Sequence, residues 1–204
     1  MPYDVAPKLI KQFNPDGIIL SGGPETVVQK ITPRAPQIIF DLACPILGIC
    51  YGMQTMAQQL GGKVKIAARH EYGQTQVMLS PSPLITAKEL SVWMSHGDRI
   101  DTLPKGFVPI ARTANAPVAA MANIRRKLFG LQFHPEVVHT PMGTSLLENF
   151  VLQVCGCRPL WDMKSFVDYE IAAIRRKVGK KGKVVCALSG GVASSVGALL
   201  PHRA

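Results

Sequence analysis

Two kinds of hydrophobic pattern share the first part of the chain. Short apolar runs at residues 17–20 and 45–49 predict buried strands, and glycines follow each of them. The segments 34–44 and 53–60 have helical character. The order strand, helix, strand predicts parallel neighbours in an α/β sheet, with both glycine turns at the carboxyl ends of their strands.

After residue 62 the pattern changes to strand-like runs, and a helix follows only near residue 150. An amphipathic helix is predicted over 142–154, where apolar residues recur at helical spacing. Residues 1–16 are predicted to form a helix and a loop. The expected fold class is α/β, an open and mostly parallel sheet flanked by helices. Further strands are predicted at 63–67, 75–79, 107–113, 117–122 and 127–133.

Composition excludes several classes of protein. The chain has 204 residues, 47% of them hydrophobic, and no stretch approaches the roughly 20 apolar residues of a membrane span. No signal segment follows Met1. The five cysteines form no disulfide-like framework, so a reducing cytoplasm is expected.

The net charge of +10 is unevenly distributed. The final 47 residues carry 9 Lys and Arg against 3 Asp and Glu. A solvated helix end or a phosphate-bearing partner accounts for this excess, whereas nucleic acid is not expected, because no aromatic residues interleave with the charges. Most of the excess comes from Arg175, Arg176, Lys177, Lys180, Lys181 and Lys183.

Cys50 is the first candidate for chemistry. It lies between Gly48 and Gly52, after an apolar run and before a predicted helix. Glycines on both sides of a cysteine allow the sharp strand-to-helix turn of a nucleophile elbow, and the helix N-terminus is expected to lower the thiol pKa. A small buried core cysteine is the alternative.

Two further features supply possible partners for this thiol. Gly22 and Gly23 follow a strand, where exposed backbone N–H groups can bind an oxyanion. His134 and Glu136 lie two residues apart at a strand end, so both point to the same side. The carboxylate can orient the imidazole, which then accepts the thiol proton. An ordinary turn and a surface pair remain the alternatives.

The motifs at 21–24, 48–54, 95–98 and 133–136 resemble, in order and spacing, those of class I glutamine amidotransferases. The tracts around 51–56 and 130–137 resemble more narrowly the glutamine-hydrolysing GMP synthase family. The resemblance implies a flavodoxin-like domain over 1–157 that lacks its first strand.

This resemblance also implies roles for individual residues. Cys50 attacks the glutamine amide, His134 acts as base and acid, and Glu136 orients His134. Backbone N–H groups of Gly23 and Tyr51 hold the oxyanion. Glutamine is bound by Gly22, Gln54, Gly97 and Asp98. Hydrolysis of glutamine needs no cofactor or metal. His96 is assigned a structural or substrate-loop role in a turn at 95–98, and His70, His139 and His202 are expected to be solvated.

A second glycine turn lies near the end of the chain. After a linker and basic helix over 158–182, residues 183–188 are predicted to form a strand that begins a second α/β domain, 183–204. The loop after this strand resembles the pyrophosphate-binding loop of ATP pyrophosphatase domains. This resemblance implies that the loop binds ATP. Its residues are Ser189, Gly190, Gly191, Val192, Ala193, Ser194 and Ser195.

In that family the second domain uses ATP and Mg²⁺ to aminate XMP, giving GMP, and the complete enzyme is a homodimer. Ala193 replaces an aspartate of the pattern, and Pro201 is expected to strain the following helix. Both ends of the family pattern are missing, so the resemblance implies a fragment that cannot make GMP alone. A component of another triad amidotransferase and a non-catalytic truncated module are the competing hypotheses.

Overall fold

The computed structural model describes residues 1–159, 163–179 and 182–204. It divides into two compact units, Met1–Cys157 and Arg158–Ala204, each described by itself. The first unit begins with α1 (Pro7–Phe13), which ends at Asn14 in the left-handed conformation. Its other elements are β1 (Ile18–Leu20), η1 (Gln37–Phe40), β2 (Ile46–Ile49), α2 (Tyr51–Gln59), β3 (Lys63–Leu79), β4 (Glu89–Thr102), β5 (Val108–Arg112), β6 (Ala120–Asn123), β7 (Leu128–Leu131), α3 (Gly143–Glu148) and the π-helix η2 (Asn149–Val154).

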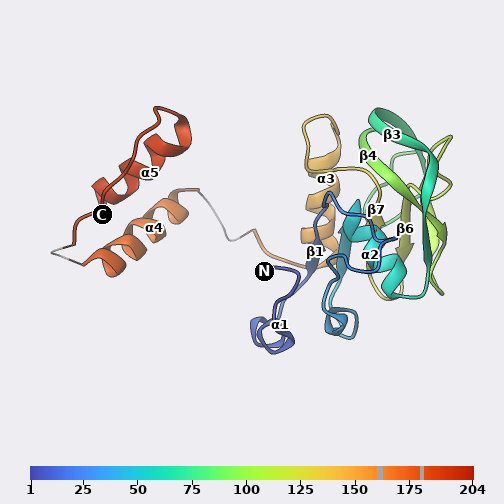
Figure 1. Ribbon diagram of the computed structural model, residues 1–204, viewed down its shortest axis with the longest axis horizontal. Coiled ribbons are helices and arrows are strands. Elements are labelled where there is room, and N and C mark those ends of the chain that lie inside the picture. The colour runs from blue at the N-terminus through green and yellow to red at the C-terminus, as the bar shows by residue number, and fades with distance from the viewer. Residues whose placement is uncertain (160–162, 180–181) are drawn as a thin grey trace. The chain divides into compact units, whose positions relative to one another are not determined.

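One sheet of seven strands organises this unit, in the order β1-β2-β7-β6-β5-β3-β4 (Figure 1). The predicted α/β class is confirmed, but the sheet is mixed. Parallel pairing is confined to β1 with β2 and β2 with β7, and the remaining neighbours are antiparallel. Hairpins make antiparallel pairs, and they join β3 to β4, β5 to β6 and β6 to β7, whereas a connection containing η1 joins β1 to β2, and β2 and β7 are far apart in the chain.

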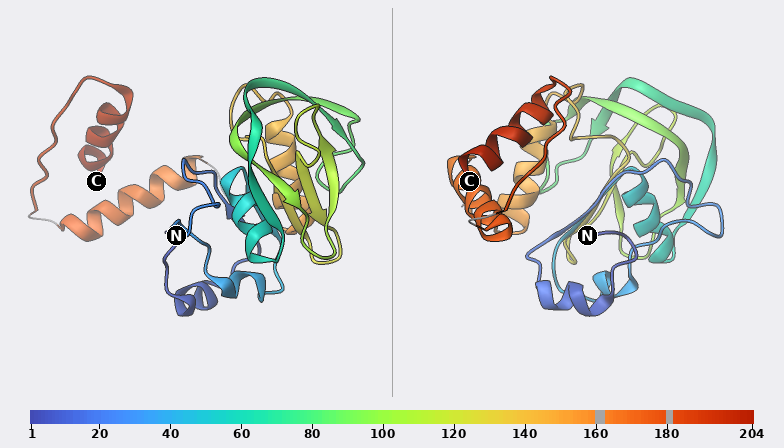
Figure 2. Two further views of the ribbon diagram at one scale, coloured as in Figure 1. Left: turned by 45° about the vertical axis from the view of Figure 1, so that its right-hand side comes forward. Right: turned by 60° about the vertical axis from the view of Figure 1, so that its left-hand side comes forward.

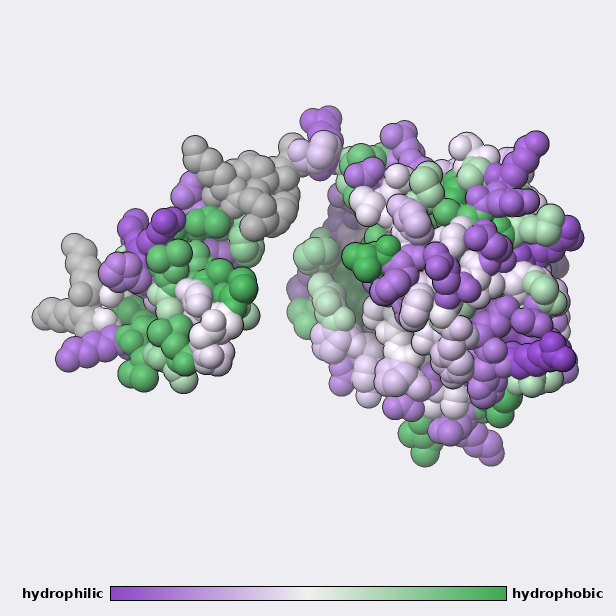
Figure 3. Space-filling view, turned by 90° about the horizontal axis from the view of Figure 1, so that it is seen from above, coloured by the Kyte–Doolittle hydropathy of each residue, from purple (hydrophilic) through white to green (hydrophobic). Residues whose placement is uncertain are grey.

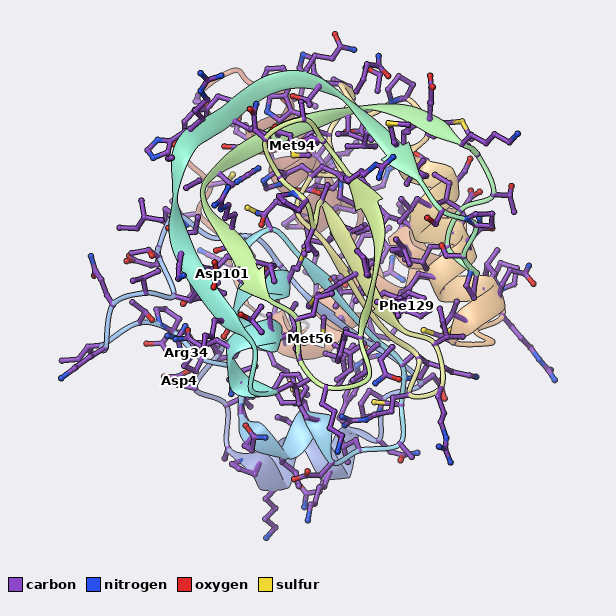
Figure 4. All side chains as sticks on the ribbon, turned by 90° about the vertical axis from the view of Figure 1, so that its right-hand side faces the viewer. Asp4, Arg34, Met56, Met94, Asp101 and Phe129 are labelled. Carbon is purple, nitrogen blue, oxygen red and sulfur yellow. The ribbon has the colours of Figure 1, made fainter. Side chains whose placement is uncertain are left out.

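Strand β2 is the centre of the hydrophobic core, and all of its residues are buried. Adjacent side chains on it enter two different clusters, Leu47 with Phe129 and Ile46 with Met56. Phe129 meets Phe150 of η2 edge to face, with ring centroids 6.4 Å apart. Both faces of the sheet at β2 are therefore covered by buried side chains, and Figure 4 labels one residue of each cluster, Phe129 and Met56.

The helix predicted over 34–44 is wrong, since only the short 3₁₀ helix η1 forms there. Pro36 restricts the residue before it, and Pro45 pushes Cys44 away from helical geometry. The predicted helix over 142–154 forms as α3, which continues as η2.

The two strands predicted at 63–67 and 75–79 form one long strand, β3. It pairs with β4 on both sides of an irregularity between Ile66 and Glu71. The predicted turn at 95–98 is also wrong, because these residues lie inside β4. Hydrogen bonding across this ladder overrides the local preferences of the polar residues (Figure 2).

The second unit contains α4 (Met163–Val178) and α5 (Val192–Arg203). The Arg175 guanidinium donates from Nε to the Ala204 carbonyl at 2.7 Å and from Nη2 to the Arg203 carbonyl at 2.8 Å. Arg175, Arg176 and Lys177 lie in the last turn of α4. Lys180 and Lys181, and part of the predicted linker, lie outside the described residues.

The strand predicted at 183–188 is not formed, and these residues are exposed coil. A strand needs a neighbour for its backbone hydrogen bonds, and the described part of this unit places none beside it. Helix α5 follows the glycine turn as predicted and runs through Pro201 to Arg203. Pro201 has no N–H to donate to the carbonyl four residues earlier, at Gly197, and the helix ends two residues later, at Arg203.

Candidate active site

Cys50 lies at a sharp turn between β2 and α2. Its backbone has φ 49° and ψ −106°, a conformation that non-glycine residues rarely adopt. The two flanking glycines are required by close packing. A Cβ on Gly48 would come within 2.6 Å of the Gly52 backbone, and one on Gly52 would overlap the carbonyl of Leu20 on β1. The sharp strand-to-helix turn predicted around this cysteine is therefore confirmed.

The Cys50 side chain is buried, with 5% of its surface exposed. Its thiol donates a hydrogen bond to the Ser95 carbonyl at 3.5 Å, and the Gln132 side-chain amide lies 3.7 Å from Sγ. Burial raises the pKa of the thiol to about 11, and the charges of Glu136 and Asp98 add to this effect. Hydrogen bonds from the Tyr51 backbone N–H and the Gln132 side-chain amide lower the pKa and offset part of this rise.

The Tyr51 N–H at the start of α2 lowers the pKa of Cys50 in the expected direction, but burial outweighs it and the net shift of the pKa is upward. Removing the thiolate from water costs more than the helix end and its amide donors return. Cys50 is consequently a neutral thiol near pH 7. Any reaction as a nucleophile then requires a nearby base that accepts the thiol proton.

The structure brings His134 and Glu136 together beside Cys50. The His134 Nδ1 lies 2.6 Å from a Glu136 carboxylate oxygen. A Cβ on Gly22 would lie 3.1 Å from His134 Cε1 and 3.8 Å from Cys50 Cβ. The imidazole and the Cys50 side chain therefore both approach the position that a Gly22 side chain would occupy, and the absence of that side chain leaves the position open.

The His134 backbone is fixed by β4 and by a threonine. Its N–H donates to the Trp93 carbonyl at 3.0 Å, and the Thr140 hydroxyl donates to the His134 carbonyl at 2.6 Å. The same hydroxyl accepts from the Trp93 N–H at 3.0 Å. His139, predicted to be solvated, is exposed and stacks on the Trp93 ring, with centroids 4.5 Å apart.

A cavity of about 300 Å³ opens over Cys50. Its lining includes most of the residues predicted to bind glutamine or its oxyanion, drawn from the elbow, β4 and the loop after β1. Gly22, His134 and Glu136 lie outside the lining. The lining residues from the predicted set are Gly23, Cys50, Tyr51, Gln54, Gly97 and Asp98.

One wall of this cavity is held by buried hydrogen bonds to Asp98. The Gln54 side-chain amide donates from Nε2 to the Asp98 carbonyl at 3.3 Å. The Thr26 hydroxyl donates to the Asp98 carboxylate. Arg34 holds the loop that carries Thr26 by donating to the Val27 carbonyl at 2.7 Å. The sequence pattern had not indicated Thr26, because no motif marks it.

His96, which lines the cavity, contacts buried Glu71, a residue that the sequence pattern had not indicated. His96 Nε2 is 3.1 Å from a Glu71 carboxylate oxygen, and Nδ1 is 2.9 Å from the Asp98 carbonyl. Both side chains are buried, and the Thr113 hydroxyl donates to Glu71 at 2.8 Å. His96 thus supports the backbone of Asp98, in keeping with the structural role assigned to it.

The loop at 189–195 is described separately, since it belongs to the second unit. Gly190 has φ 84°, and the Ser194 and Ser195 hydroxyls donate to the Gly191 carbonyl at 2.9 and 3.0 Å. The Ser189 hydroxyl donates to Ser194 Oγ at 3.1 Å. All seven loop residues were predicted to bind ATP. Ser189, Gly190 and Gly191 precede α5, the other four residues form its first turn, and the segment 183–188 before them is coil.

The described residues offer neither a metal-binding cluster nor a membrane-spanning helix. No group of three or more His, Cys, Asp or Glu side chains in these ranges is arranged to hold a metal ion. None of the helices described in the structure is both long and apolar enough to cross a membrane.

Comparison with known proteins identifies the class to which this arrangement belongs. The family model described as glutamine amidotransferase class-I matches residues 1–154. The chain therefore belongs to the class I glutamine amidotransferase family. Over its whole length it is 52% identical to a GMP synthase (glutamine-hydrolyzing) of Coxiella burnetii, and over 99% of it 53% identical to that of Vibrio campbellii.

The chain spans 41% and 40% of the lengths of these two relatives. A solved structure from Thermoplasma acidophilum, described as that of a putative GMP synthase component, matches with a TM-score of 0.69 and 31% identity. That match covers 76% of this chain and 79% of the other. The predicted amidotransferase fold and the resemblance to GMP synthases are therefore confirmed.

Proposed function

We propose that this chain hydrolyses the side-chain amide of glutamine by means of Cys50, His134 and Glu136. The proposal rests on the positions of the Cys50 side chain and the His134–Glu136 pair, because Cys50 and His134 both lie close to Gly22. A buried cysteine in a strained elbow, an oriented imidazole and an adjoining cavity are the parts that acyl transfer requires. Membership of the amidotransferase family supports glutamine as the substrate.

The first step follows from the neutral state of the thiol. His134 accepts the proton of Cys50, and Glu136 stabilises the resulting imidazolium through Nδ1. The sulfur forms a bond to the amide carbon of glutamine, and the carbonyl electron pair moves to oxygen. Backbone N–H groups of Gly23 and Tyr51 are proposed to stabilise this oxyanion, because both residues line the cavity at the end of β2.

Ammonia and glutamate then leave in two further steps. The carbon–nitrogen bond breaks while the nitrogen takes the proton from His134, which releases ammonia and leaves a thioester on Cys50. A water molecule gives a proton to His134, its oxygen attacks the thioester, and the carbon–sulfur bond breaks as sulfur regains the proton. Gln54 and Asp98 are proposed to hold the glutamine backbone from the cavity wall.

In the complete protein we propose that the ammonia aminates XMP to GMP at the expense of ATP. Similarity to GMP synthases supports this use of the product. Hydroxyl groups and the α5 N-terminus at 189–195 suit phosphate oxygens, although Ala193 supplies no carboxylate for a divalent cation. The chemistry proposed for the described residues therefore yields ammonia and glutamate and does not include the use of ATP.

Glutamate release by the purified chain tests the proposal. We expect glutamate from glutamine, and no release above the protein-free rate after Cys50→Ala. His134→Ala should lower the rate by about 10²- to 10⁴-fold, because the thiol then lacks its base. A Cys186→Ala variant serves as the control, since that exposed cysteine lies in the second unit. Equal rates for the original chain and Cys50→Ala would refute the proposal and favour the non-catalytic module.

A further inference from the structure

Gln132 is a fully buried polar residue that the mechanism above does not use. It follows β7 and lies two residues before His134, with none of its surface exposed. Its backbone N–H donates to the Ala119 carbonyl at 2.8 Å, which fixes the main chain at the end of the sheet. Its side chain extends to the reactive centre, where Nε2 lies 3.7 Å from Cys50 Sγ.

The orientation of the Gln132 amide is set by Gln54. Gln54 Nε2 donates to Gln132 Oε1 at 3.2 Å and to the Asp98 carbonyl at 3.3 Å, so both of its hydrogens are used. Rotating the Gln132 amide by half a turn would face one NH₂ group with another in a buried site. That arrangement would leave donors unpaired and costs about 1–3 kcal/mol for each. The Gln132 NH₂ group is therefore held towards the sulfur.

We propose that Gln132 is a catalytic residue, whose side-chain amide donates a hydrogen bond to Cys50 Sγ and stabilises the thiolate that attacks the substrate. The inference rests on the proposed glutaminase function. A thiolate at this position is buried and also faces the negative charges of Glu136 and Asp98. Among the described side chains, Gln132 alone donates a hydrogen bond to this sulfur. It thereby offsets part of the cost of forming the anion.

The contacts also connect the thiol to the cavity wall. The path runs from the Asp98 carbonyl through Gln54 and Gln132 to Cys50, and the Gln54 and Gln132 side chains are buried along it. Gln54 also lines the cavity in which glutamine is proposed to bind. A substitution at Gln54 should therefore alter the hydrogen bond between the Gln132 amide and Cys50 Sγ.

Alkylation of Cys50 tests this role without glutamine. In a Gln132→Met variant the side-chain volume is kept and the donor is lost. Iodoacetamide reacts with the thiolate, so we expect the rate at Cys50, followed by mass spectrometry between pH 7 and 10, to fall about ten- to a hundredfold. Gln59→Met on the same helix as Gln54 is the matched control and should leave the rate unchanged, since Gln59 contacts Ala35 and not the sulfur.

A second variant covers the case in which Gln132→Met does not fold, as judged by circular dichroism. Gln54→Met keeps Gln132 but removes the donor that orients it, and we expect a smaller fall in the Cys50 alkylation rate. Unchanged alkylation in the folded Gln132→Met chain, or in Gln54→Met where the first variant is unfolded, overturns the inference. Absence of glutamate release from the original chain would instead refute the proposed function, because alkylation does not depend on it.

Discussion

Two regions of this chain carry the same local pattern and adopt different structures. Residues 45–52 and 183–191 each contain an apolar run followed by glycines, and a helix follows both. In the first region the run forms β2 and the turn forms the Cys50 elbow. In the second region the helix α5 forms, but the run before it remains exposed coil.

The difference lies in the neighbours that each apolar run finds. Strand β2 pairs with β1 on one side and β7 on the other, and its side chains are buried on both faces. In the second region Val185 is 98% exposed and Leu188 is 63% exposed. Figure 3 shows hydrophobic side chains gathered on the visible face of that unit. An apolar run forms a strand only where other segments supply partners for its backbone hydrogen bonds and bury its side chains.

Removing an apolar side chain from the core around β2 and one from 183–191 should reveal the largest difference in stability between the two regions. Phe129→Ala leaves a cavity between β7 and η2, and we expect a loss of about 4 kcal/mol in the free energy of unfolding. Leu188→Ala should change it by less than about 0.5 kcal/mol, because that side chain is largely exposed. Urea denaturation followed by circular dichroism measures both. Comparable losses would show that the second region has a packed core.

The glycine turns provide the next comparison. Gly52→Ala places a methyl group on the Leu20 carbonyl, so we expect about 3 kcal/mol of destabilisation, at the upper end for overpacking. A methyl group on Gly191 meets only Ser189 Oγ, at an ordinary 3.6 Å, and Gly191→Ala should be nearly neutral. Thermal unfolding of the two variants checks this. A tolerated Gly52→Ala would mean that β1 does not approach the elbow so closely.

The cysteines of the two regions should differ in reactivity. Because burial raises the pKa of Cys50 to about 11, its thiolate fraction without substrate rises about tenfold for each pH unit up to that value. Exposed Cys186 should therefore react first with iodoacetamide at pH 8. Peptide mass spectrometry distinguishes the sites, and denaturation in urea should bring their rates together. Faster reaction at Cys50 in the folded chain would contradict the neutral thiol.

The sequence alone determined the parts of the site that depend on short motifs. Glycines around Cys50 predicted the elbow, because only residues without a side chain allow the approach to β1. The spacing of His134 and Glu136 predicted their proximity, and His134 Nδ1 lies 2.6 Å from a Glu136 oxygen, although β7 ends at Leu131 and Glu136 lies in a turn rather than on a strand. Such features are local, so a few residues specify them.

Only the tertiary structure decided the features that depend on distant segments. Pairing with β3 places 95–98 inside β4, whereas 183–188 pair with no strand among the described residues and are coil. Packing from several elements made the Cys50 thiol neutral, against the expected effect of the helix end. Gln132 contacts Cys50, which lies 82 positions away in the sequence, and Glu71 contacts His96, which lies 25 positions away. No short motif encodes such contacts, because burial and hydrogen bonding at one residue are set by whichever segments the fold places against it.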